Sequence, residues 1–161
     1  PPPPPPPVTI PSGTELSVQL ASGYSTKTAV VGEAASGTLT AASIITAAVK
    51  AVPVKQIGYS GLMLPVMEDS RLAQRWGEGS FTLDALLAYS AVCATGLDTV
   101  PLPGDITEEQ LARILGDVAS LAVKWRKPLA ARLQPVPGKR PGALTQFNDP
   151  FLVNTTLQRL P

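Results

Sequence analysis

Two adjacent carboxylates, Glu68 and Asp69, end the stretch GYSGLMLPVMEDS, which spans residues 58–70. Carboxylates can act as general acids or bases, or they can hold a cation. On an extended backbone, neighbouring side chains point to opposite faces, so both reach one ion only if a turn follows. Pro65 and Ser70 allow such a turn. The alternative, which we favour, is that the pair caps a helix beginning near Asp69 and Ser70.

Cys93 and Asp98 are near neighbours in the sequence but differ as candidates for chemistry. Cys93 is expected at the C-terminal end of a helix, where the dipole disfavours a thiolate, so we interpret it as buried and inert rather than nucleophilic. Asp98 lies in TGLDTVPLPGD, residues 95–105, and has no adjacent helix to cap. Asp105, by contrast, can serve the first turn of the helix that follows. Asp98 is therefore the more interesting of these two carboxylates as a candidate for chemistry.

Arg132 and Lys139 are the cations whose positions suggest contact with an anion. Arg132 lies in a strand predicted at 129–136, and an arginine in a buried strand needs a carboxylate or an anionic ligand as its partner. Lys139 follows in the turn VPGKRPG, where it is either a second ligand contact or a solvated lysine. Proximity of Glu68, Asp98 and Arg132 would distinguish a ligand-binding or catalytic site from isolated charges.

The composition excludes several classes of site. The 161 residues include no histidine and one cysteine, which excludes His-based triads, an intrachain disulfide and a Cys-rich zinc site. Thirteen basic and twelve acidic residues give a net charge of +1, so we expect no nucleic-acid partner. No apolar stretch approaches the ~20 residues of a membrane helix, so we expect no membrane span. No motif indicates a metal or a particular cofactor.

The elements that would position these residues divide the chain into three parts. Residues 1–7 are all proline and are expected to form a polyproline spacer. Residues 8–36 are rich in Thr, Val, Ser and Gly and alternate in TELSVQL, which predicts a short β-rich segment. Residues 37–161 alternate helices with extended apolar runs, which predicts an α/β fold with parallel strands. We expect helices at 40–52, 82–93 and 107–127, a strand or extended segment at 54–66 and a strand at 129–136.

The helix at 107–127 carries the clearest local signals. Thr107 and Gln110 fit a capping box, and Pro128 follows the last turn. The chain itself begins at Pro1, without a methionine or a signal-like apolar region, so we expect a processed product or a fragment.

Four runs occur in order: GYSGLMLPVMEDS, LLAYSAVCATGLDTVPLPGD, ARLQPVPGKRPG and FNDPFLVNTTL. Together they resemble the C-terminal portion of domain-of-unknown-function family 711, also called uncharacterised protein family 0210, over roughly residues 37–161. The resemblance implies part of an α/β barrel like that of glycyl-radical enzymes, a homodimer and a cytoplasmic location. Ala94 stands where the family usually has glycine, and Ala143 where it usually has aspartate. Neither a glycyl-radical loop nor paired cysteines are present, so the likeness does not imply radical chemistry.

Residues 1–36 instead resemble the start of small β-rich domains in secreted bacterial envelope proteins. Three hypotheses follow for the whole chain. The first is a barrel fragment that binds a small anionic ligand through Arg132 and Lys139 and has no catalysis on its own. The second is an enzyme in which Glu68, Asp69, Cys93 or Asp98 act as acid/base, metal-holding or nucleophilic groups. The third is an extracellular envelope module.

Overall fold

The computed structural model describes residues 38–57, 60–93 and 95–160. The polyproline spacer at 1–7 and the β-rich segment at 8–36 lie outside the described residues. The elements follow in the order α1 (Thr38–Ala51), α2 (Ser70–Gly77), α3 (Leu83–Cys93), β1 (Gly96–Pro103), α4 (Glu108–Trp125) and β2 (Ala130–Val136).

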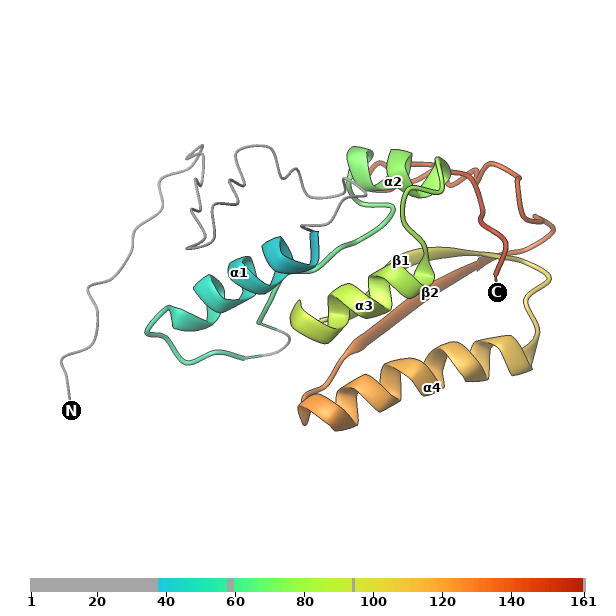
Figure 1. Cartoon of the computed structure of the whole chain (residues 1–161). Coiled ribbons are helices and arrows are strands. Elements are labelled where there is room, and N and C mark those ends of the chain that lie inside the picture. Colours follow the sequence, from blue (N-terminus) through green and yellow to red (C-terminus); the bar gives the residue numbers. More distant parts are fainter. Residues whose placement is uncertain (1–37, 58–59, 94, 161) are drawn as a thin grey trace, which may run out of the picture.

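The two strands form a parallel pair, and α4 is the crossover that joins them. Figure 1 shows α3 beside β1 and α4 beside β2, and these helix–strand pairs are in contact. Parallel strands need such a crossover because their ends lie far apart. The α/β class and the parallel arrangement predicted from the sequence are therefore confirmed.

Local signals set the ends of α4. The Thr107 side chain accepts a hydrogen bond from the Gln110 backbone N–H, and the Gln110 side chain accepts one from the Thr107 N–H, which completes the predicted capping box. Arg126 follows the helix in the left-handed conformation, with φ 48°. The described elements also confirm the predicted helix at 82–93 and the predicted strand at 129–136, each within a residue.

The sequence analysis did not predict the first strand of the sheet. The range 54–66 was expected to be a strand or extended, but its described residues form only one bridge, from Pro65 to Asp98. The strand lies instead at Gly96–Pro103, for which no element was predicted. The two stretches differ in burial: all eight residues of β1 are buried, whereas Ile57 in the first stretch is 80% exposed.

The hydrophobic core gathers around β1 and joins α2, α3 and α4. Trp76 and Phe81 pack edge to face, with their ring centroids 5.8 Å apart. The largest fully buried apolar side chains of the core are Trp76, Met67, Leu86, Leu97, Leu102, Val66 and Val100.

The C-terminal segment after β2 folds back on itself and then runs along α2 (Figure 1). Thr145 and Thr155 join the two arms of this return through their backbones, at 2.9 Å. Thr155 Oγ1 then donates to the Ala73 carbonyl of α2, and Gln158 Nε2 donates to the Trp76 carbonyl. The segment therefore closes one end of the core.

Candidate functional site

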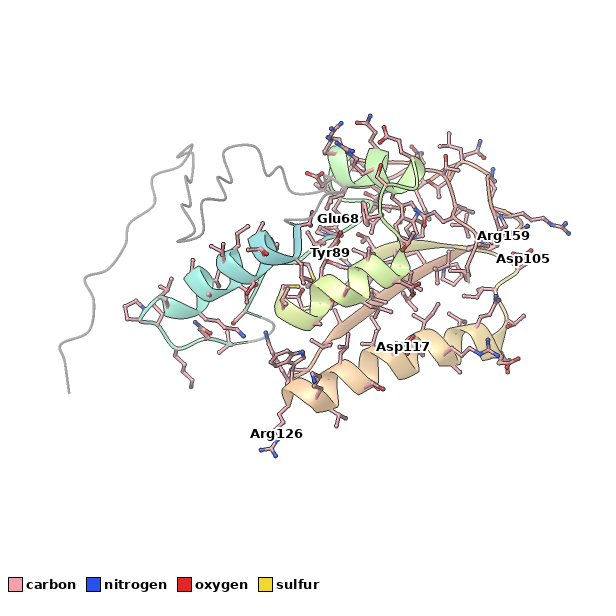
Figure 2. The ribbon with its side chains drawn as sticks, viewed as in Figure 1. Glu68, Tyr89, Asp105, Asp117, Arg126 and Arg159 are labelled. Atoms are coloured by element: carbon pink, nitrogen blue, oxygen red, sulfur yellow. The ribbon has the colours of Figure 1, made fainter. Side chains whose placement is uncertain are left out.

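The adjacent carboxylates Glu68 and Asp69 have different tasks. Asp69 is the N-cap of α2, and its Oδ1 accepts a hydrogen bond from the Leu72 backbone N–H at 2.7 Å. The cap predicted for the pair is thus formed by Asp69. Figure 2 shows Glu68 close to α2, and its carboxylate has a different partner.

That partner is Arg132 of β2, which also binds Asp98 of β1. Arg132 Nη2 donates to Glu68 Oε1 at 2.6 Å, and Arg132 Nε donates to Asp98 Oδ1 in a short hydrogen bond. The Asp98 side chain is only 8% exposed, whereas that of Arg132 is 52% exposed. We call these three residues the Arg132 cluster. The sequence named all three as candidates, and the fold brings them together.

Asp98 lies in a bulge of β1. The register shifts between Leu97 and Val100, so one extra residue of β1 lies opposite β2. Thr99 within the bulge has φ 43°, an unusual conformation for a β-branched residue. Bulges re-aim side chains and are common beside functional sites, and strained residues persist only where surrounding contacts hold them.

The same bulge fixes the segment that carries Glu68. The Val66 N–H donates to the Asp98 carbonyl at 3.1 Å, and the Met67 N–H donates to Thr99 Oγ1 at 3.3 Å. From the other side, the Val153 N–H donates to the Met67 carbonyl at 2.7 Å. Glu68 therefore follows two anchored residues. Sequence reasoning missed Thr99, because nothing in TGLDTV indicates a left-handed residue inside a buried strand.

Electrostatics bind the cluster together. The hydrogen bond that Arg132 donates to Asp98 raises the pKa of Arg132 above its ordinary value. The negative charges of Asp98 and Glu68 also raise it, whereas desolvation lowers it. The bonds to the two carboxylates use Nε and Nη2. In the described part of the chain, Nη1 makes no hydrogen bond, so one edge of the guanidinium is available.

The structure does not bring Cys93 or Lys139 to the cluster. Cys93 is 1% exposed, and its Sγ lies 3.4 Å from Thr95 Oγ1. Lys139 Nζ donates to Gln146 Oε1 at 2.9 Å. Neither Cys93 nor Lys139 therefore belongs to the Arg132 cluster.

Neither a metal centre nor a membrane helix is found in the ranges that the structure covers. Among the described residues, no group of three or more His, Cys, Asp or Glu side chains could hold a metal ion. Within the same residues, no helix combines the length and apolar character needed to cross a bilayer.

Similarity to known proteins is strong but covers only part of them. The chain is 48% identical over 112 residues to a UPF0210 protein of Pyrobaculum arsenaticum, a match that covers 67% of this chain and 25% of the relative. It is 39% identical over 117 residues to a UPF0210 protein of Desulforudis audaxviator, covering 70% of this chain and 26% of the relative. The chain thus spans about a quarter of the length of these curated relatives. No solved structure gives a significant match.

The family comparison agrees with the resemblance seen in the sequence. A model described as "Uncharacterised ACR (DUF711)" matches residues 26–148. The match begins within the segment 8–36, earlier than the residue 37 expected from the sequence. Because it covers more than half of the residues, the chain belongs to the uncharacterised DUF711 family.

Proposed function

We propose that the Arg132 cluster binds a small anionic ligand that also carries a hydroxyl group, and that this chain does not catalyse a reaction on its own. One observation carries the proposal: two carboxylates fix Arg132, yet its side chain stays 52% exposed. A guanidinium held in one orientation loses little freedom when a carboxylate or phosphate docks on its remaining edge. Arg132 is thus a pre-organised anion contact.

The charge of the cluster narrows the ligand class. When both carboxylates are ionised, two negative charges face one positive charge, which opposes a bare anion. Glu68 Oε2 makes no hydrogen bond in the described part of the chain, so it can accept one from a ligand hydroxyl. A hydroxy acid or a polyol phosphate meets both requirements, because its anion contacts Arg132 while its hydroxyl contacts Glu68.

The remaining part of the site would come from the longer protein. Among the described residues β2 has only β1 as a neighbour, and an open parallel edge is suited to pairing with a further strand. Several large apolar side chains are also exposed, including Ile57, Val123 and Phe151, each near 80%. These features support a larger closed sheet, such as the barrel implied by the family resemblance, and a homodimer. Light scattering on a full-length relative tests the dimer.

Calorimetric titration of the chain with glycerol 3-phosphate tests ligand binding, with ethyl phosphate as the control that lacks hydroxyl groups. We expect weak binding, with Kd in the mM range (about −4 kcal/mol), and a preference for glycerol 3-phosphate. Glu68→Gln should reduce that preference while keeping phosphate binding. Equal, unsaturable signals for both probes would overturn the proposal.

A catalytic role for the same carboxylates is the second candidate. The left-handed Thr99 in the bulge favours it, since strained residues cluster at active sites. In that case Glu68 or Asp98 would exchange a proton with the bound ligand in the full-length protein. Exchange of a ligand C–H proton for solvent deuterium, followed by NMR in a full-length relative, should then be lost when the residue that corresponds to Glu68 is changed to Gln, although ligand binding is retained.

A further inference from the structure

A hollow of about 270 Å³ lies where the end of α2, the start of α3 and the C-terminal segment meet. We call it the α2–α3 hollow. It is smaller than the roughly 300–1,000 Å³ typical of drug-sized ligands, so it suits a compact molecule. None of its residues belongs to the Arg132 cluster. The residues that matter for recognition are Trp76, Leu83, Asp84, Gln158 and Arg159.

The apolar part of the hollow is formed by buried, well-packed side chains. Trp76 is 1% exposed and packs edge to face on Phe81, and Leu83 is 5% exposed. Gln158 Nε2 donates to both the Trp76 carbonyl at 2.6 Å and the Phe81 carbonyl at 2.9 Å. These bonds tie the C-terminal segment to the end of α2. An apolar group entering the hollow therefore meets a wall that is already formed.

The charged part of the hollow is unpaired in the described chain. Asp84 and Arg159 both line it, and neither side chain makes a hydrogen bond or an ion pair with another described residue. A place in the first turn of α3 accounts for a negative charge at Asp84. Arg159, which is exposed, brings a positive charge to the lining of the same hollow. Opposite charges around an apolar wall match a ligand that itself carries both charges.

We propose that the α2–α3 hollow binds a small zwitterion, an α-amino acid with an apolar side chain. Its ammonium group contacts Asp84, its carboxylate contacts Arg159, and its side chain packs on Trp76 and Leu83. This site is independent of the Arg132 cluster, so the two sites can fail or succeed separately.

Trp76 fluorescence in the full chain tests the proposal. Trp125→Phe leaves Trp76 as the one tryptophan, since the chain has two. L-Leucine is the probe, with N-acetyl-L-leucine lacking the cation and L-leucinamide lacking the anion. Amide chemical shifts of residues 82–84 and 158–160 are recorded in the same titration, so a silent indole does not hide binding. We expect leucine to bind about tenfold more tightly than either analogue, the equivalent of one lost charged contact.

Two variants, each of which removes one charge, then assign the two contacts. Asp84→Asn should weaken the binding of leucine and leucinamide but leave N-acetyl-leucine unchanged. Arg159→Gln should weaken the binding of leucine and N-acetyl-leucine but leave leucinamide unchanged. Both side chains are exposed, so both variants should fold, and Glu68→Gln should leave leucine binding unchanged. Unsaturable leucine titrations, or equal affinity for leucine and its two analogues, would overturn the proposal.

Discussion

The Arg132 cluster and the α2–α3 hollow each bring opposite charges together, but only the cluster joins them. Asp98 is buried in β1 and therefore requires a cation, which Arg132 supplies. Asp84 and Arg159 are exposed, so water solvates their charges without a protein partner. The difference teaches that pairing follows from burial. Substitutions in the Arg132 cluster should thus change stability, whereas substitutions of Asp84 and Arg159 in the α2–α3 hollow should change only binding.

The largest expected effect is on stability, and it comes from a substitution at the start of β1, where β1 and β2 approach closely. Gly96 has φ 96°, and a Cβ there would meet the backbone of Ala130, with its N atom at 2.6 Å and its carbonyl oxygen closer still. Gly96→Ala should lower the free energy of unfolding by at least about 3 kcal/mol, measured by urea denaturation.

Gly79 provides the matched control, because it lies just after α2 and outside the sheet. Its φ is 71°, but an added Cβ would have nothing within 4 Å. Gly79→Ala should therefore cost only about 1 kcal/mol, from the left-handed conformation alone. Similar losses in both variants would show that backbone conformation, rather than strand contact, dominates at Gly96.

The second prediction separates the two arginines. Arg132→Met leaves Asp98 buried without its cation, which should cost about 2–3 kcal/mol in the free energy of unfolding, less than a fully buried pair because Arg132 is half exposed. Arg159→Met should change the same quantity by less than about 0.5 kcal/mol. The double variant Arg132→Met, Asp98→Asn should recover part of the loss. No recovery would mean that Arg132 stabilises the sheet through packing.

The third prediction concerns the outer member of the cluster. The Glu68 side chain is 35% exposed, so its ion pair with Arg132 is partly screened by water. Glu68→Gln should lower the free energy of unfolding by about 0.5 kcal/mol. The difference from wild type should shrink in 1 M NaCl, where the Debye length is about 3 Å. A loss as large as that of Arg132→Met would show that Glu68, and not Asp98, holds the arginine.

Sequence reasoning was sufficient wherever the signal is local. Thr107 and Gln110 lie three residues apart and predicted the start of α4, and the cap at Asp69 was predicted in the same way. Arg132 was recognised as needing a partner because it lies in a predicted strand, and Asp98 was selected because it has no local task. Their pairing could not be deduced, since β1 carries Pro101 and Pro103 and did not resemble a central strand.

The α2–α3 hollow is a feature that the sequence did not predict. Asp84 and Arg159 are 75 positions apart in the sequence, and neither stands in a recognisable motif. They reach one hollow because Gln158 hydrogen-bonds the carbonyls of Trp76 and Phe81. Contacts of this kind depend on how the C-terminal segment packs, and residue type and spacing do not encode that packing. The sequence therefore indicated no ligand at this position.

The smallest expected effect concerns Lys127. Its surroundings lower its pKa, whereas those of Arg132 raise the pKa of that residue. Burial lowers the pKa of Lys127 below 10.5, and the positive charge of Lys50 lowers it further, whereas Cys93 raises it. Between this depressed pKa and 10.5 the unfolded chain binds more protons than the folded chain, so stability rises with pH across that window. Lys127→Met should flatten the rise, measured by urea denaturation at pH values approaching 10.5, whereas the exposed Lys124→Met should preserve it. If both variants keep the wild-type slope, another group sets it. If stability falls with pH instead, the favourable contact of Lys127 Nζ with the Ser60 carbonyl outweighs burial.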